Sequence, residues 1–324
     1  MSGKVLFVSQ NEYGRAENLT ALFDAYDGHK VFIRGLERMR TAANDGYSVI
    51  VCDALPEYVE NKGDCKIINI CHGMTGNKVY GMHERAEWVN PDAFAQTDYA
   101  IAASKASISI VAQQLGIPTE RVKALGFPRT DIYADMVKGD GDTALARFQS
   151  YLYAPTFRDS DKGGYLPDVD WQKLDSMLDD NELLAVKRHY FTQDPLLDCE
   201  YRHVIEIDPQ EPITPYLVDC DCLITDYSSC MTDGYLLGKP CVLVIDDIDE
   251  YLHDRPMYYP YPQTYSSRWL VMGGNEEYLV SFMRDAIERG MMDAERNYRE
   301  LTAGACDGHS CERICELIRR CLDG

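Results

Sequence analysis

Long apolar runs are missing from this 324-residue sequence, and so are the short motifs of several common enzyme chemistries. No stretch of 18 or more apolar residues occurs, which argues against an ordinary membrane-spanning helix. G-x-S-x-G, the Walker A motif and G-x-G-x-x-G are also missing, so the sequence shows no serine-hydrolase elbow, P-loop or standard dinucleotide fingerprint. The opening MSGKVLFVSQ has only a short apolar run, which predicts a first strand rather than a signal-peptide core.

Positive charge is scarce as well. The chain has 32 Lys and Arg against 53 Asp and Glu, a formal net charge of -21. A surface of this sign suits neither nucleic acid nor the anionic face of a membrane. We therefore expect no nucleic-acid partner, and the lack of a long apolar run predicts no transmembrane segment. The expected location is cytoplasmic, with at most peripheral contact at the inner face of the cell membrane.

Cysteine, by contrast, is plentiful, with 12 residues. Without a signal peptide, the simplest expectation is a reducing compartment and reduced, mostly buried thiols. The segment CDGHSCERICELIRRC, residues 306–321, is the one cluster that could hold a metal. Within it, Cys311 and Cys315 are spaced i and i+4 beside Ile314 and Ile318, as on the buried face of a helix. We expect core packing and no bound metal, with a zinc site as the alternative.

Apolar runs and amphipathic stretches alternate along the chain, which is typical of βα units in doubly wound parallel sheets. The pattern weakens in the polar, helix-like stretch 131–149 and then restarts. Together with the chain length, this predicts two α/β domains, residues 1–135 and 136–324. The clearest expected strands cover residues 4–10, 29–35, 47–56, 65–73, 150–159, 201–208 and 241–247, and the clearest expected helices cover residues 16–28, 275–290, 293–304 and 309–322. Ligands are expected beyond the carboxyl ends of the strands.

The segment DCLITDYSSCMTDGYLLGKPCVLVIDD predicts a buried strand, a sharp turn, a helix ending at Gly238 and a second buried strand. Ser228 and Ser229 fall where this helix begins. A serine there serves first as an N-cap, and that alternative stays open. Two hydroxyls beside the N–H groups of a helix N-terminus also suit a phosphate. Asp226 and Asp233 would repel a phosphate unless they face a hydroxyl or an amine, which favours a ligand that carries both phosphates and hydroxyls.

Six segments together resemble, in order, motifs of the CDP-glycerol glycerophosphotransferases, the family of teichoic acid polymerases and primases. They are CHG at 71–73, GFPRTD at 126–131, APTFRD at 154–159, VKRH at 186–189, LITDYSSCMTD at 223–233 and DGHSCERI at 307–314. The resemblance implies a GT-B-like fold, with two Rossmann-like domains facing a central cleft. It also implies transfer of glycerol phosphate or ribitol phosphate from a CDP-alditol to a hydroxyl of a wall or surface polymer or a lipid-linked saccharide, with release of CMP. No cofactor is expected besides the donor substrate.

The same resemblance assigns roles to particular side chains. His72 would act as general base and His189 would stabilise charge. The donor and its phosphates would be bound by Arg129, Arg158, Lys187, Asp226, Ser228, Ser229 and Asp233, and the acceptor side would include Gly73 and Lys78. The N-terminal domain would then take the acceptor and the C-terminal domain the CDP-alditol.

Simpler interpretations remain for several of these residues. His72 could be an ordinary hydrogen-bonded residue at a strand end, Arg129 and Arg158 could pair with the aspartates two and one residues after them, and Arg313 could be a solvated surface charge. The sequence also departs from the family pattern at Cys71, in MTGNK at 74–78, at Thr130 and at Tyr190. Two other functions therefore stay open: a GT-B glycosyltransferase or epimerase that uses a UDP-sugar, and a non-catalytic nucleotide-binding relative.

Overall fold

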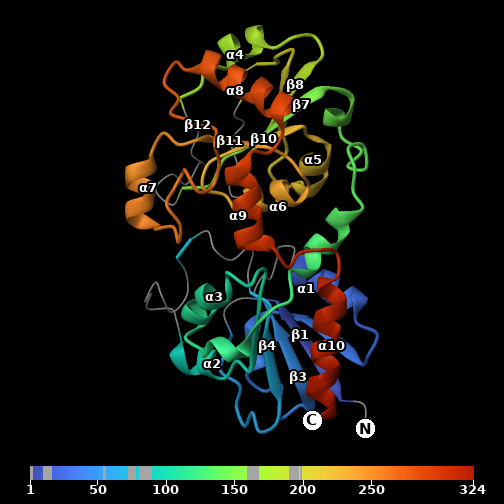
Figure 1. The fold of residues 1–324 in the computed structure, drawn as a ribbon. Helices are drawn as coiled ribbons and strands as arrows, with labels where there is room; N and C mark the ends of the chain where they lie inside the picture. The colour runs from blue at the N-terminus through green and yellow to red at the C-terminus, as the bar shows by residue number, and fades with distance from the viewer. Residues whose placement is uncertain are drawn as a thin grey trace. The chain divides into compact units, whose positions relative to one another are not determined.

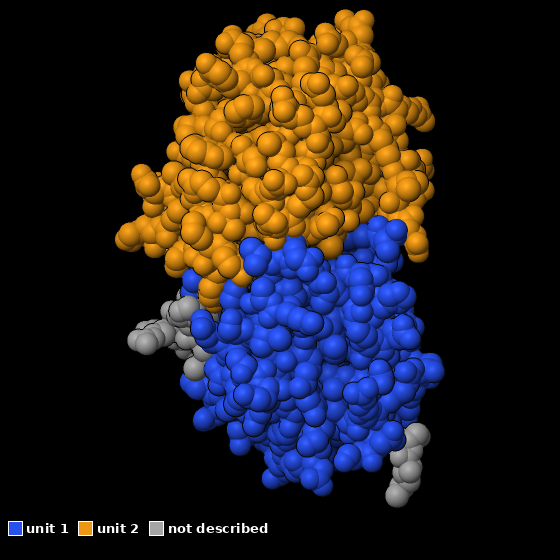
Figure 2. All heavy atoms as spheres, in the orientation of Figure 1, with its two compact units in different colours: residues 1–134, 300–324 blue, residues 135–299 orange. Residues whose placement is uncertain are grey.

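The structure is a computed structural model that describes residues 3–9, 17–53, 56–71, 78–79, 90–158, 168–189, 197 and 199–324. The chain divides into two compact units, Met1–Ala134 with Glu300–Gly324, and Asp135–Arg299 (Figure 2). Each unit contains a six-stranded parallel sheet with helices, which confirms the predicted α/β class.

The sheet of the first unit has the strand order β2-β1-β3-β4-β5-β6. Figure 1 labels three of its strands, β1, β3 and β4. Its strands are β1 Lys4–Ser9, β2 Lys30–Arg34, β3 Tyr47–Cys52, β4 Lys66–Asn69, β5 Tyr99–Ala102 and β6 Val122–Ala124. Strand β1 is buried on both faces: Leu6 packs in a core with Met39, while the ring of Phe7 meets that of Phe23 edge-on at 5.4 Å. Burial on both faces explains the continuous apolar runs from which these strands were predicted.

The sheet of the second unit has the order β12-β11-β10-β7-β8-β9. Its strands are β7 Gln149–Ala154, β8 Glu182–Lys187, β9 Val204–Ile207, β10 Cys222–Thr225, β11 Cys241–Val244 and β12 Trp269–Leu270. Alternate side chains supply two separate cores. Ile224 of β10 packs on one face with Leu174 and Met283 from helices, whereas Leu223 packs on the other face with Met231 and Tyr235.

Ten α-helices and four 3₁₀ turns are present among the described residues. The helices are α1 Glu17–Ala25, α2 Pro91–Ala95, α3 Ile108–Leu115, α4 Trp171–Met177, α5 Thr214–Asp219, α6 Cys230–Leu236, α7 Ile248–Asp254, α8 Glu276–Arg289, α9 Asp293–Ala303 and α10 Ser310–Asp323, and the turns are η1 Leu36–Met39, η3 Thr119–Arg121, η4 Pro128–Ala134 and η5 Ala144–Arg147. Gly116 directly follows helix α3, and Gly238 follows helix α6 after Leu237. Both glycines have positive φ, 62° and 74°, the left-handed ending that the sequence predicts.

The C-terminal helix differs from the sequence prediction. Residues 300–324 were assigned to the second domain, but they belong to the first unit, where α10 packs against α1 and β3. Ile314 and Ile318 are fully buried there. An amphipathic pattern predicts that a helix has a buried face, but it does not say which sheet receives that face.

The polar stretch 131–149 also differs, because it forms short 3₁₀ turns rather than a helix. The buried carboxylate of Asp219 accepts hydrogen bonds from the backbone N–H groups of Gly139, Gly141 and Thr143, at 2.8, 3.1 and 2.8 Å. This carboxylate stands in for the backbone partners that a regular helix would supply.

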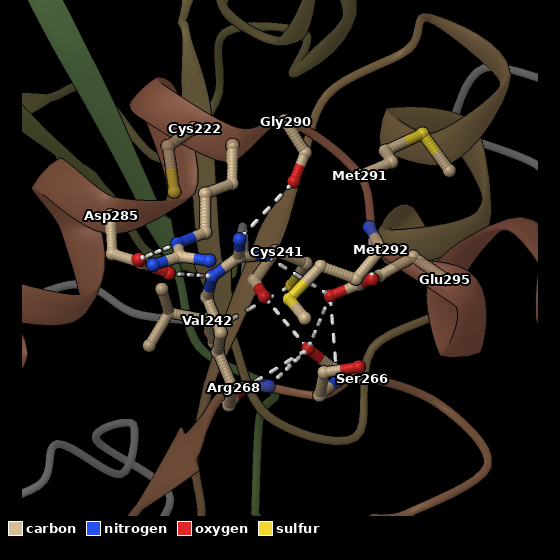
Figure 3. A network of polar contacts seen from close by, with 12 residues as sticks. Cys222, Cys241, Val242, Ser266, Arg268, Asp285, Gly290, Met291, Met292 and Glu295 are labelled. Atoms are coloured by element: carbon tan, nitrogen blue, oxygen red, sulfur yellow. Dashed lines mark hydrogen bonds and ion pairs between the residues drawn. The ribbon is translucent and has the colours of Figure 1, made fainter.

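A buried polar network closes the amino-terminal end of the second sheet (Figure 3). Arg268 directly precedes β12, and its guanidinium pairs with Asp285 at 2.9 Å and Glu295 at 3.4 Å. It also donates to the carbonyl of Gly290 at 3.2 Å. Ser266 donates to Glu295 at 3.0 Å. The network therefore ties the strand start to the end of α8 and the beginning of α9.

The described part of the chain contains no helix with both the length and the apolar character needed to cross a membrane.

Candidate functional site

The loops that follow four adjacent strands carry most of the predicted donor residues. In the strand order β11-β10-β7-β8, these loops begin at Ile245, Asp226, Pro155 and Arg188. All four strands are parallel, so the loops emerge at the same edge of the second sheet. This carboxyl edge is where doubly wound sheets bind ligands.

The turn after β10, Asp226–Ser229, is named here the serine turn. Asp226 and Tyr227 are buried, whereas Ser228 and Ser229 are only half-buried. Helix α6 begins at Cys230, whose N–H donates to the Ser228 hydroxyl at 3.3 Å. Within the described residues, the Ser229 hydroxyl makes no capping bond to its own helix. Ser229 holds the N-cap position, but the serine hydroxyl that accepts the N–H at the helix start belongs to Ser228, the residue before it.

Arg158 follows β7 and reaches across to the serine turn. Its guanidinium donates to the carboxylate of Asp226 at 3.0 Å and, with two nitrogens, to that of Asp247 at 2.6 and 2.9 Å. A further nitrogen donates to the carbonyl of Thr156 at 2.6 Å. Arg158 thus pairs with two aspartates far along the chain, while its neighbour at position 159 lies outside the described residues. We name Arg158, Asp226, Asp247 and Tyr227 the Arg158 network.

The electrostatics of this network favour its charged form. Burial alone would lower the pKa of Arg158, but its bonds to Asp247 and the charge of Asp226 raise that pKa above its usual value. Burial raises the pKa of the Asp247 carboxyl, yet the hydrogen bonds and charge of Arg158 outweigh burial and lower it. The charges of Arg158 and Asp247 therefore stabilise each other.

Two tyrosine rings complete the surroundings of Arg158. Tyr227 and Tyr251 stack with centroids 3.7 Å apart and planes 8° apart. The guanidinium carbon lies 4.9 Å from the first centroid and 4.7 Å from the second. The Tyr227 hydroxyl donates to Asp247 at 3.0 Å. Sequence reasoning missed Asp247, although its place just beyond an apolar strand is the signal that led to the other site residues.

His189 and Lys187 both lie at the end of β8, but they point to different surroundings. The half-buried His189 contacts the ring of Phe157, with centroids 5.5 Å apart, which brings it beside the loop that carries Arg158. The ammonium of Lys187 instead donates to the carbonyl of Pro209 at 2.9 Å, on the β9 side of β8. Burial lowers the pKa of Lys187.

Asp233, the remaining predicted donor residue, lies in the first turn of α6 and is buried. A carboxylate near a helix N-terminus is stabilised by the N–H groups there. The serine turn, Arg158, His189 and Asp233 thus lie within one unit, around adjacent strand ends.

The predicted residues of the first unit are only partly described. His72 and Gly73 lie outside the described residues, and Lys78 is half-buried. Arg129 pairs with Glu17 at 3.7 Å rather than with Asp131.

Asp131 has a different task, which joins two of the six motifs. Its carboxylate accepts the N–H groups of Ser310 and Cys311 at 2.9 and 2.7 Å, so GFPRTD caps helix α10 of DGHSCERI. Arg313 was expected to be a solvated charge, but it donates to the carbonyls of Leu125 and Ala305, at 2.9 and 2.6 Å. Hydrogen bonds therefore hold these two motif regions together within the first unit.

The two helical cysteines of the suspected metal cluster differ in burial, since Cys311 is only half-buried. Cys315 is buried on α10, and burial raises the pKa of the Cys311 thiol. Among the described residues, no three His, Cys, Asp or Glu side chains gather in a way that could hold a metal ion.

Comparison with known proteins gives a family and several relatives. The family model for CDP-glycerol:poly(glycerophosphate) glycerophosphotransferase matches residues 5–320. The teichoic acid ribitol-phosphate polymerase TarL of Staphylococcus aureus is 26% identical over 214 residues, which cover 60% of this chain and 38% of the relative. The teichoic acid ribitol-phosphate primase of Bacillus spizizenii is 27% identical over 237 residues, which cover 68% of this chain and 59% of the relative. The matches thus span less than two thirds of either relative.

Solved structures share the fold. A variant of the wall teichoic acid polymerase TagF superposes with a TM-score of 0.79 at 19% identity, covering 100% of this chain and 90% of that one. Staphylococcus aureus MnaA with UDP gives a TM-score of 0.59 at 12% identity, covering 99% and 97%. At these identities the likeness concerns the fold alone.

Proposed function

The chain belongs to the CDP-glycerol:poly(glycerophosphate) glycerophosphotransferase family, and we propose that it transfers glycerol phosphate or ribitol phosphate from a CDP-alditol to a hydroxyl of a teichoic-acid-like acceptor. The acceptor is a polymer or a lipid-linked saccharide. The names of the relatives, teichoic acid polymerases and primases, support a transferase of this class. The second unit takes the donor and the first unit the acceptor.

The observation that carries the donor assignment is the serine turn. Ser228 and Ser229 are half-buried, while Asp226, Tyr227 and Cys230 around them are buried. A donor phosphate at this turn would meet two hydroxyls and the first N–H groups of α6. His189 lies in the loop after β8, at the same edge of the sheet. It would stabilise charge on the phosphate or on the departing CMP.

Other side chains complete the proposal. Asp233 suits the hydroxyls of the alditol or ribose, since a carboxylate accepts from a hydroxyl and repels a phosphate. Arg129 and Lys187 would have to leave Glu17 and the Pro209 carbonyl to reach a phosphate. On the acceptor side we assign Gly73 and Lys78, with His72 as general base.

The proposed reaction balances as a single displacement. The acceptor oxygen forms a bond to the alditol-bearing phosphorus, and the bond from that phosphorus to the CMP oxygen breaks. The proton of the acceptor hydroxyl passes to the imidazole of His72, and CMP carries away the negative charge. In-line geometry and charge neutralisation are the tasks left to the protein.

Location forms part of the same proposal. With a net charge of -21, the chain has little electrostatic attraction to an anionic membrane. We place the enzyme in the cytoplasm, with at most peripheral contact at the membrane where a lipid-linked acceptor would lie.

Release of CMP tests the activity. The protein is incubated with CDP-glycerol, CDP-ribitol or a UDP-sugar, each with saccharide and lipid-linked acceptors, and the nucleotide product is measured. His72→Ala should lower turnover by roughly 10² to 10⁴, with donor affinity nearly unchanged. The matched control is His253→Ala, which removes an exposed histidine of α7. Release of UDP with no CMP would assign the chain to UDP-sugar chemistry, and donor binding without turnover would make it a non-catalytic relative.

A further inference from the structure

Arg158 is tied to the serine turn through both residues that precede the serines. Asp226 accepts from Arg158 with one oxygen and from the N–H of Tyr227 with the other, at 3.0 and 2.7 Å. Tyr227 in turn donates to Asp247, which Arg158 holds with two hydrogen bonds. The contacts close a ring, Arg158 to Asp226 to Tyr227 to Asp247 and back.

The backbone of the turn is held at the same point. Thr156 donates its N–H and its hydroxyl to Asp226, at 2.8 and 2.5 Å. The hydroxyl of Tyr261 donates to the carbonyl of Asp226 at 3.0 Å. Hydrogen bonds from two other loops thus fix the orientation of Asp226. They also fix the direction of the backbone that leads to Ser228 and Ser229.

The guanidinium faces inward. The Arg158 side chain is 8% exposed, and its guanidinium contacts Asp226, Asp247, the Thr156 carbonyl and the two stacked rings. A bidentate phosphate clamp through Nε and Nη2 would require the bonds to the two aspartates to open. The sequence resemblance suggested a phosphate clamp, and the geometry points to a different task.

We propose that Arg158 is a positioning residue, which orients Ser228 and Ser229 toward the donor through Asp226 and Tyr227 and does not touch the donor phosphate itself. This inference rests on the proposed function, in which the serine turn binds a CDP-alditol. The planar fork of arginine satisfies two carboxylates at once, whereas a lysine ammonium cannot match that geometry. Arg158→Lys is therefore the informative substitution, because it keeps the charge and removes the fork.

A double-mutant cycle with CDP-glycerol separates the possible roles. Affinity is measured by calorimetry for the wild type, Arg158→Lys, the pair Ser228→Ala with Ser229→Ala, and all three changes together. We expect Arg158→Lys to weaken binding about tenfold when the serines are present, and less than about twofold when they are absent. In turnover it should raise KM more than it lowers kcat.

Each other result contradicts the proposal in a recognisable way. If the effects of arginine and serines multiply, Arg158 contacts the donor directly. If Arg158→Lys changes stability alone, as the matched Arg268→Lys should, the network is only structural. Should Arg158→Lys not fold, Asp247→Asn replaces it in the cycle, because it keeps the arginine and removes the bidentate anchor.

A measurement without ligand keeps this inference separate from the proposed function. If the wild type binds neither CDP-glycerol nor CDP-ribitol, the proposed function fails. Amide hydrogen exchange of residues 226–231 still tests the positioning role. We expect exchange there to accelerate about tenfold or more in Arg158→Lys and to stay unchanged in Arg268→Lys. Equal protection of the turn in both variants would overturn the proposal.

Discussion

Two buried arginines of the second unit have nearly the same chemistry at opposite edges of one sheet. Arg158 pairs with two carboxylates at the carboxyl edge, and Arg268 pairs with two at the amino edge. Their side chains are 8% and 3% exposed. Each also donates to a backbone carbonyl. Side-chain chemistry alone therefore does not tell the two networks apart.

The surroundings of the two arginines do distinguish the two networks. The Arg158 network ends at a turn whose last two hydroxyls remain half-buried, and it lies beside His189 across Phe157. The network around Arg268 joins a strand start to two helices, and its other hydroxyl, on Ser266, is buried and bonded to Glu295 (Figure 3). A buried ion pair by itself is weak evidence of stabilisation, because desolvation offsets much of the attraction. The position at the carboxyl edge of the sheet is why we propose a ligand-binding task for the Arg158 network and not for the Arg268 network.

The largest expected effect on folding belongs to Arg268→Met. The change leaves Glu295, which is fully buried, without its cationic partner. Removing one partner of a buried pair costs about 3–5 kcal/mol of unfolding free energy. Denaturant titration measures this cost. The affinity for CDP-glycerol, taken below the unfolding temperature, should be unchanged, and a loss of affinity would break the distinction between the two edges.

Next in size is the removal of both serine hydroxyls. Ser228→Ala with Ser229→Ala should weaken CDP-glycerol binding by more than about 1.5 kcal/mol, because hydrogen bonds to a charged phosphate are lost. The unfolding free energy should fall by only about 1 kcal/mol, since one cap bond disappears. Calorimetry and denaturant titration give the two values. Unchanged donor affinity would mean that the turn is a helix cap and nothing more.

Sequence patterns predicted most of the strands, the serine turn and its helix because those features are local, whereas the two-residue strand β12 was missed. Continuous apolar runs mark strands buried on both faces, and Gly238 marks the end of α6. The pairing of Arg158 with Asp226 and Asp247 could not be predicted from local patterns, because these aspartates lie 68 and 89 residues further along the chain. Only the sheet order brings them together. Helix α7 was missed because seven mostly polar residues give no clear apolar period.

A smaller effect is expected from Tyr227→Phe. The substitution keeps the ring stack with Tyr251 and removes the hydrogen bond to Asp247. A lost hydrogen bond of this kind costs about 0.5–1.5 kcal/mol of stability. The matched control is Tyr235→Phe, which removes the bond to the Tyr265 carbonyl in the same unit. We expect similar losses of stability from both variants but weaker CDP-glycerol binding from Tyr227→Phe alone. Equal affinities of the two variants for CDP-glycerol would mean that the Arg158 network does not contribute to donor binding.

The smallest effect lies in the acid dependence of stability, and it compares one carboxylate from each network. The pKa of Asp247 is lowered, because the bonds and charge of Arg158 outweigh burial, and that of Asp285 is lowered by its bond to Arg268. A carboxylate whose pKa is lower in the folded state stabilises the protein above its unfolded pKa. That contribution is lost as pH falls from about 5 toward the folded pKa.

The side chain of Asp285 is 35% exposed and that of Asp247 only 19%, so solvent screens the first pair more. Unfolding free energies measured at steps between about pH 6 and pH 3 should therefore fall less steeply in Asp247→Asn than in the wild type. Asp285→Asn should flatten the slope less. The comparison uses slopes rather than absolute stabilities, because each asparagine also weakens a hydrogen bond at every pH. A larger change of slope in Asp285→Asn would mean that the amino edge, and not the serine-turn edge, holds the more strongly coupled ion pair.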